Sequence, residues 1–168
     1  PLALLPFLLF PDPRLKKVAG PVLNIDDTVR RLIADMAETM YEAPGIGLAA
    51  TQVDVHKQIV VIDTSEERNQ LLALINPRIE NCRGQQEGEE GCLSVPGIYE
   101  KVQRAETCTV HYQDADGQHR TLVAEGLLAV CIQHELDHLN GKVFVDHLSQ
   151  LKQTRIRSKL AKQARVTA

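Results

Sequence analysis

Hydrophobic residues recur at helical spacing in the first quarter of the chain. Between residues 26 and 41, apolar side chains return every three or four positions, at Val29, Leu32, Ile33, Met36 and Met40. Asp26 and Asp27 stand where an N-terminal cap belongs, and Pro44-Gly45 follows the last apolar position. The pattern predicts an amphipathic helix over residues 26–41, with its two methionines packed in the core.

The pattern then changes from helical spacing to short apolar runs and strict alternation. Residues 58–63 and 71–75 are mostly apolar runs typical of buried strands. Polar and apolar side chains alternate over residues 107–112, and residues 120–123 follow a hairpin signal at Asp116-Gly117. Because the connections between these runs are short, the strands are expected to pair antiparallel.

Two further helices are predicted in the last third of the chain. The segment 125–140 opens with a stretch, residues 127–132, that is apolar on every side and therefore typical of a buried helix. Gly141 suits the left-handed cap that ends it, and a polar, basic helix is expected over residues 148–165. The elements predict an α+β fold in which antiparallel sheets pack around a buried central helix. With no repeat or linker to divide them, residues 1–168 are expected to form a single catalytic domain.

Composition and net charge exclude several classes of protein. The 168 residues are 43% hydrophobic and 24% charged, with a formal net charge of −3. These values exclude a disordered chain, a collagen and a globally basic DNA-binding protein. The charge is nevertheless uneven, because the helix over 148–165 holds no acid and the basic residues Lys152, Arg155, Arg157, Lys159, Lys162 and Arg165. On composition alone, such a helix is a solvated cationic face.

Cysteine usage and the first residues bear on the compartment. The four cysteines include no C-x-x-C pair and are too few for a disulfide scaffold, which favours a reducing, cytoplasmic compartment. Cys82 and Cys108 are predicted to be small buried hydrophobic residues. The apolar stretch 2–10 is far shorter than the ~20 residues of a membrane span, and no basic segment precedes it. We expect an extended segment over the core, with neither a signal peptide nor a membrane partner.

The buried central helix carries an H-E-x-x-H motif. His134 and His138 lie one turn apart on the same face, so both can bind one metal ion while Glu135 reaches a water molecule. The alternative is that both histidines are hydrogen-bonded core residues. That alternative would leave three ionisable side chains without partners in the most apolar helix of the chain. A site for a divalent metal ion is therefore predicted.

A catalytic site of this kind needs a third ligand. The extended pattern H-E-x-x-H-x-x-G-x-x-H fails at Phe144, and no acidic residue follows Asp146. Cys131 lies on the same helix, but donors on three successive turns of one straight helix do not converge on one ion, so it is expected to line a pocket. Cys92 is better placed, because glycine and proline predict an irregular loop over residues 89–97.

Three segments together resemble the signature motifs of the peptide deformylase family, in the same order. They are residues 45–52 (GIGLAATQ), 90–94 (EGCLS) and 133–138 (QHELDH). The resemblance extends from residues 10–15 to the C-terminal helix, and the absence of large insertions is similar to the type 1 bacterial form. It implies a metal-dependent hydrolase that removes the N-formyl group from the N-terminal methionine of new polypeptides and releases formate.

The resemblance also implies roles for individual residues. Glu135 would accept the proton of the attacking water and deliver it to the leaving amine. The backbone N–H of Leu93 and the side-chain amide of Gln52 would stabilise the oxyanion. The implied metal ligands are Cys92, His134 and His138.

Substrate-binding positions follow from the same resemblance. They are Ile46, Gly47, Glu90, Gly91, Tyr99, Leu127, Val130 and Cys131. The apolar members of this set have plain core packing as their alternative. Many family members carry arginine where this chain has Tyr99. Arg104 is either a charge near Cys92 or half of a surface ion pair.

The remaining predictions concern the metal ion, the binding partners and two alternative functions. Ligand chemistry alone favours zinc, whereas the resemblance implies Fe(II) in the cell, with Ni, Co or Zn in purified protein. It also implies that nascent formyl-methionyl peptides are the substrate, and that the basic helix docks on the ribosome. A metalloendopeptidase shares the H-E-x-x-H motif and stays an alternative, as does a non-catalytic metal-binding or ribosome-associated module.

Overall fold

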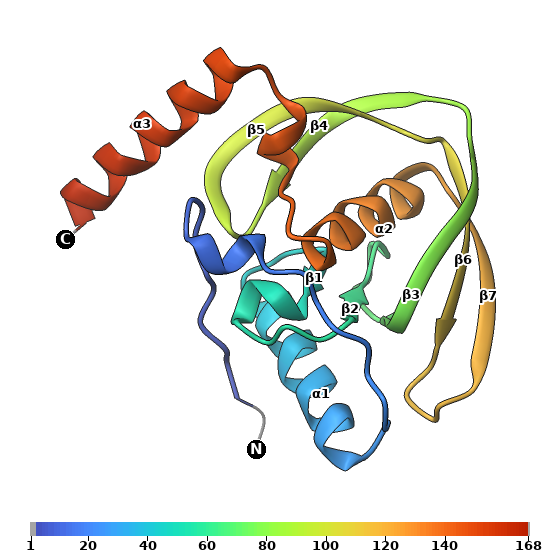
Figure 1. Ribbon diagram of the computed structural model, residues 1–168. Helices are drawn as coiled ribbons and strands as arrows, with labels where there is room; N and C mark the ends of the chain where they lie inside the picture. Colours follow the sequence, from blue (N-terminus) through green and yellow to red (C-terminus); the bar gives the residue numbers. More distant parts are fainter. Residues whose placement is uncertain (1–2, 168) are drawn as a thin grey trace.

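Three α-helices and seven strands make up the fold in the computed structural model, which describes the backbone of residues 3–167 and the side chains of residues 3–163 (Figure 1). The helices are α1 (Asp27–Glu42), α2 (Gly126–Leu139) and α3 (Gln150–Thr167). The strands are β1 (Gly47–Ala49), β2 (Ile59–Ile62), β3 (Leu72–Arg83), β4 (Gln86–Cys92), β5 (Val95–Arg104), β6 (Thr107–Gln113) and β7 (His119–Glu125). The predicted helices, and the strands expected near 58–63, 107–112 and 120–123, all form.

The strands form two antiparallel sheets. Five strands pair in the order β1-β2-β3-β6-β7, and β4 pairs with β5 in a separate two-stranded sheet. Helices cover both faces of the larger sheet at β2, so Val60 and Ile62 pack against α2 while Ile59 and Val61 pack against α1. Because both faces are covered, the sequence of this strand is a continuous apolar run rather than an alternating one. This arrangement is the predicted α+β fold around a central helix.

The central helix α2 is fixed at its C-terminal end by glycine. Gly141 adopts a φ of 78°, in the left-handed region that ends many helices. A side chain at this position would collide with the backbone carbonyl of Lys16, so the close approach of the N-terminal segment also requires glycine. Ala129, Ile132 and Leu136 face the core of the sheet. The other face of α2 is left for the histidines.

The sheet of β4 and β5 corrects two expectations. Residues 89–97, predicted as an irregular loop, are mainly strand, with Leu93 and Ser94 forming the turn and a bulge between Glu90 and Cys92. Only β5 supplies apolar side chains to the core beneath, so β4 shows no hydrophobic alternation from which a strand could be predicted. Cys82 was expected to be buried, but it lies exposed near the end of β3 because that end of the strand extends beyond the core.

The N-terminal segment and the C-terminal helix contact the rest of the fold in different ways. The N-terminal segment is extended, as predicted, and hydrogen-bonds the backbone around the site, from Leu8 N–H to Gln52 O at 2.7 Å and from Phe10 N–H to Ser94 O at 2.7 Å. Figure 1 shows α3 (red) on the outside of the fold. Ile156 and Leu160 of this helix pack into the same core cluster as the apolar side chains of β5. The side chain of Arg165 lies outside the described side chains. Within the described residues, no helix combines the length and apolarity that crossing a membrane requires.

Candidate active site

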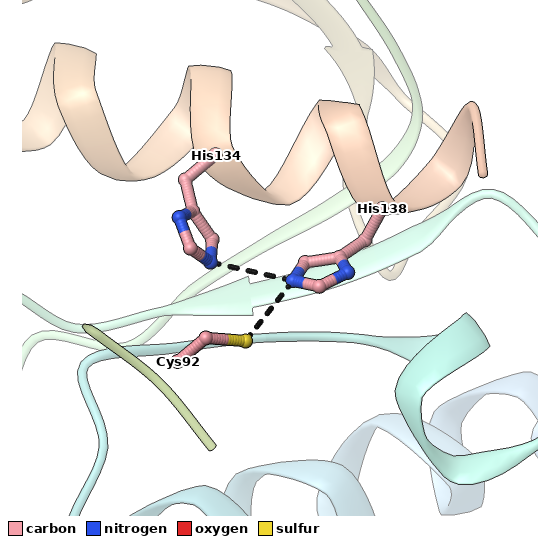
Figure 2. A group of neighbouring side chains, drawn as sticks. All are labelled: Cys92, His134 and His138. Carbon is pink, nitrogen blue, oxygen red and sulfur yellow. Dashed lines mark hydrogen bonds between the residues drawn. The ribbon is translucent and has the colours of Figure 1, made fainter. Parts of the chain in front are cut away.

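The two histidines of α2 face each other at one turn's separation. His134 and His138 are buried, and their Nε2 atoms lie 3.3 Å apart (Figure 2). Two ring nitrogens in such contact cannot both carry a proton without repulsion. The helix therefore presents a pair of nitrogen donors aimed at one point, as residues i and i+4 allow.

Cys92 completes this group from the other side. Its Sγ lies 3.3 Å from Nε2 of His138, and the three donor atoms of Cys92, His134 and His138 all lie within 4.8 Å of one another. Donors placed tetrahedrally around an ion at bonds of about 2.0–2.3 Å are roughly 3.3–3.6 Å apart. The separations and the chemistry of the donors therefore fit a four-coordinate divalent ion with one position left over. Cys131 does not belong to the group, as predicted, and lines the cavity instead.

The two imidazoles differ in their surroundings. Burial lowers the pKa of His138 well below its ordinary value, which favours the neutral imidazole that metal ions bind. The Nδ1 atom of His134 lies 2.9 Å from a carboxylate oxygen of Glu90. A carboxylate only accepts, so Nδ1 carries a proton, and in the neutral ring Nε2 is then the nitrogen with a lone pair for a metal ion. Burial lowers the pKa of His134, but the hydrogen bonds with Cys92 and Glu90 outweigh it and raise the pKa well above its ordinary value, so a bound ion would displace the proton from Nε2. Glu90 thus fixes both the orientation and the tautomer of this ring.

Behind Glu90 lies a buried guanidinium. Arg104 donates from Nε and Nη2 to the two oxygens of Glu90, each at 2.8 Å, and from Nη1 to Asp137 at 2.6 Å. His147 lies 2.8 Å from the same oxygen of Asp137. Burial raises the pKa of Glu90, but the hydrogen bonds from Arg104 and His134 outweigh it and lower the pKa to about 2. Arg104 is therefore not a surface ion pair, and its direct partner is Glu90 rather than Cys92.

Glu135 has the opposite environment. Its side chain is buried, and one carboxylate oxygen, Oε1, has no hydrogen-bond partner in the described structure. Burial raises the pKa of Glu135 to about 7. A Cβ on Gly47 would lie 2.5 Å from Oε2 of Glu135, so only glycine leaves room for this carboxylate. Such a group can both take and return a proton near neutral pH.

Gln52 presents its amide nitrogen to Cys92. Its Oε1 accepts from the backbone N–H of Ala49 at 2.9 Å, so the NH2 group points the other way, 3.4 Å from Sγ of Cys92 and 3.1 Å from Oγ of Ser94. Leu93 follows Cys92 in the turn between β4 and β5. Ser94 is fully buried; it belongs to the motif at residues 90–94, but the sequence analysis assigned it no role.

A cavity of about 590 Å³ brings the predicted residues together. Its wall includes all the predicted catalytic and substrate-binding residues, whereas His138 lies beneath it, fully buried. Glu90 differs from expectation, because both its oxygens are already bound by Arg104 and one of them by His134. Phe7 and Pro44 also line the cavity and were missed, since neither stands in a pattern typical of a site.

Residues that the sequence analysis did not predict also hold one edge of the cavity in place. The carbonyl of Ile46 accepts from Asp63 N–H at 2.8 Å, and Arg68 donates to the carbonyl of Gly45. The guanidinium of Arg68 lies 5.0 Å above the ring of Tyr41, whose hydroxyl donates to Asp63 at 2.6 Å. Residues 45–47 therefore form a braced edge rather than a free loop.

Comparisons with known proteins agree on one family. A family model described as polypeptide deformylase matches residues 4–154. The peptide deformylase of Azotobacter vinelandii is 60% identical to the chain over 165 residues, which cover 98% of each protein. A crystal structure of a peptide deformylase from Legionella pneumophila has a TM-score of 0.94 at 47% identity and covers 98% of both chains. A peptide deformylase from Ehrlichia chaffeensis in complex with actinonin has a TM-score of 0.93 at 38% identity, covering 96% of this chain and 98% of that chain.

Proposed function

The chain belongs to the polypeptide deformylase family and is a metal-dependent hydrolase that removes the N-formyl group from nascent peptides, and from this premise we propose which of its residues carry the reaction. One observation supports the proposal above the others. A buried glutamate with a pKa of about 7 lines one cavity with Cys92 and His134, and His138 converges with these two donors from beneath the cavity. The whole chain, in this proposal, acts as one catalytic domain.

Cys92, His134 and His138 hold the metal ion. When bound there, the ion supplies a Lewis acid that lowers the pKa of a water molecule toward neutrality. The soft thiolate and two imidazoles suit several divalent ions, of which Fe(II) is the one we propose for the cell, with Ni, Co or Zn as replacements in purified protein. Glu90 does not contact substrate in this proposal but orients His134, with Arg104 keeping its charge in place.

Glu135 moves the proton. Its carboxylate accepts a proton from the attacking water, holds it while the C–N bond of the formamide breaks, and delivers it to the departing amine. The products are formate and a free N-terminus. A pKa of about 7 keeps both transfers close to balance at neutral pH.

Gln52 and Leu93 stabilise the charge that develops on the formyl oxygen. The NH2 group of Gln52 is held toward Cys92 by the contact of its carbonyl with Ala49, so it donates without first having to reorient. The backbone N–H of Leu93 is the second donor. Both belong to rigid segments beside the metal ligand.

The substrate peptide lies along the braced edge and sends its methionine side chain inward. Ile46 and Gly47 offer extended backbone to the peptide, in the manner of an added strand. Leu127, Val130 and Cys131 form the apolar wall for the methionine. Gly91 and Tyr99 complete the cavity, and Tyr99, which is well exposed, is at its rim.

The basic helix α3 is the proposed contact with the ribosome, in the cytoplasm. It lies on the outside of the fold (Figure 1). Ile156 and Leu160 attach it to the core, while Lys152, Arg155, Lys159 and Lys162 are exposed. RNA phosphates would bind such a face in a salt-dependent way. Neither membrane nor DNA has a part in this proposal.

The replacement Glu135→Gln tests the catalytic assignment. It preserves shape and removes the proton acceptor, so we expect kcat to fall by about 10²–10⁴-fold while metal content, measured by elemental analysis, is unchanged. The matched control Glu87→Gln removes an exposed carboxylate of β4 outside the cavity and should leave kcat unaltered. Full activity of the Glu135→Gln enzyme would refute the assignment.

A further inference from the structure

Two cysteines outside the active site lie opposite each other on neighbouring strands. In the pairing of β3 with β6, Glu80 faces Thr109 and Arg83 faces Thr107, so two residues, 81 and 82, stand opposite Cys108. This is a β-bulge, which increases local twist and redirects side chains. Asn81 has a φ of 52°, a left-handed conformation that asparagine tolerates. The bulge places Cys82 beside Cys108.

The two thiols are in contact but differ in access. Their Sγ atoms lie 2.8 Å apart. Cys82 is exposed, whereas Cys108 is 1% exposed beneath the strand. Burial, and then the hydrogen bond with Cys82, raises the pKa of Cys108 to about 12. The pair therefore combines a solvent-accessible thiol with a protected one.

We propose that Cys82 and Cys108 form a reversible dithiol–disulfide pair, whose oxidant is a small-molecule disulfide of the glutathione type. The two Sγ atoms already lie 2.8 Å apart across the bulge, so a short movement of the two side chains reaches the S–S bond length of about 2.0 Å. The bond can thus close without separating the strands. This proposal does not depend on the assignments made for the active site.

The reaction balances as two thiol–disulfide exchanges. The thiolate of Cys82, the accessible residue, attacks one sulfur of oxidised glutathione, forming a mixed disulfide and releasing one glutathione. Cys108 then loses its proton, and its sulfur attacks Sγ of Cys82 and displaces the second glutathione. The two cysteines are oxidised by two electrons in total, the external disulfide is reduced, and both protons end on the released thiols.

The new bond would link the two ends of the segment that carries Cys92. Residues 83–107, which lie between the two cysteines, contain all of β4 and β5. The two cysteines lie on β3 and β6 of the five-stranded sheet, whereas β4 and β5 form the separate two-stranded sheet. Linking its two ends restricts the unfolded chain, as a disulfide across a loop of this length does. We expect Tm to rise by about 5–10 °C on oxidation.

Peptide mapping tests the proposal on the metal-loaded enzyme. The protein is equilibrated in buffers of reduced and oxidised glutathione, alkylated, and digested with trypsin without reduction. Cleavage after lysine and arginine places the four cysteines in separate peptides: 79–83, 84–101, 105–120 and 121–142. We expect peptides 79–83 and 105–120 to become linked in oxidising buffer and to separate when reductant is added. A stable glutathione adduct on Cys82 without that link, or links shared among all four peptides, would overturn the proposal.

Two variants separate the bond from general effects of oxidation. Cys82→Ser changes an exposed side chain, so the fold should be retained, and we expect neither the linked peptides nor the rise in Tm. Cys108→Ala removes the second thiol, and Cys82 should then accumulate as its mixed disulfide with glutathione. An equal rise in Tm for wild type and Cys82→Ser would contradict the proposal.

Discussion

At the scale of single residues, two buried carboxylates that are far apart in the sequence, Glu90 and Glu135, lie near the same histidine, His134, yet differ in pKa. Glu90 receives both arms of Arg104, which lowers its pKa to about 2, whereas burial raises the pKa of Glu135 to about 7. A pair of groups whose environments push their pKa values apart is typical of a site where one holds charge and the other transfers protons. Here Glu90 supports His134, and Glu135 is free to react.

The amide of Gln52 provides a sharp test at this scale. Removing one oxyanion donor costs about 10²–10³ in kcat, and we expect Gln52→Ala to fall in that range with metal retained. Gln52→Glu keeps the acceptor for Ala49 N–H but has no N–H to donate, so it should lose kcat to a similar degree. Steady-state deformylation kinetics with metal analysis would show this, and wild-type kcat in both variants would remove the residue from the mechanism.

Asp63 binds the backbone at the braced edge of the cavity, and its ionisation makes the stability of the fold depend on pH. Burial raises its pKa, but hydrogen bonds from Ser65, Tyr41 and Gln70 outweigh it and lower the pKa to about 2, below the ordinary value of 3.8. Its stabilisation is therefore present above about pH 4 and lost as pH falls toward 2. We expect Asp63→Asn to lower the free energy of unfolding by about 2 kcal/mol at pH 7.

Urea unfolding of both proteins at pH 7 and pH 3 would measure that dependence. The difference between wild type and Asp63→Asn should shrink on acidification, because at pH 3 Asp63 is mostly protonated in the unfolded chain while it is still mostly ionised in the folded protein. A difference that stays constant between the two pH values would show that ionisation of Asp63 contributes nothing to stability.

At the scale of elements, the site is assembled from three supports that meet at one cavity. α2 supplies both imidazoles and Glu135, the turn between β4 and β5 supplies Cys92, and the edge at β1 faces them. The edge is held by Arg68 and Asp63, which bind the carbonyl of Gly45 and the backbone of Ile46. Precise placement of reactive groups depends on such rigid supports.

The basic helix α3 is an element whose role can be tested separately from catalysis. Arg155, Lys159 and Lys162 are exposed, and reversing all three to glutamate should weaken co-sedimentation with ribosomes at low salt. Deformylation of a short peptide should not change, since the helix lies apart from the cavity. Lys16→Glu with Lys17→Glu serves as the control for charge alone. Unaltered co-sedimentation of the α3 variant would refute ribosome binding through this helix.

At the scale of the whole molecule, the sequence predicts elements that bury a periodic apolar face and misses those that do not. α1, α2 and β2 were predicted because both the spacing and the burial of their side chains are regular. β4 was missed, since only Glu90 of its residues is buried, and the strand is held by pairing with β5. Pairing between distant segments leaves no local pattern to detect.

The residues of the site divide in the same way, into those that a local sequence pattern predicts and those that meet only in the folded chain. His134, His138 and Glu135 follow from spacing on one helix, and Cys92 was favoured by elimination before the family resemblance named it. The connection from buried Arg104 through Asp137 to exposed His147 joins β5, α2 and the segment after it, so its members meet only in the folded chain.

The most direct test of the central claim is formate release from a formyl-Met-Ala-Ser peptide by anaerobically prepared protein, with and without a chelator. The account predicts release that is confined to the formylated peptide, is abolished by the chelator and is restored by Fe(II), Ni or Co. Cleavage of an unformylated peptide would indicate an endopeptidase instead. No formate release by folded, metal-loaded protein would contradict the account.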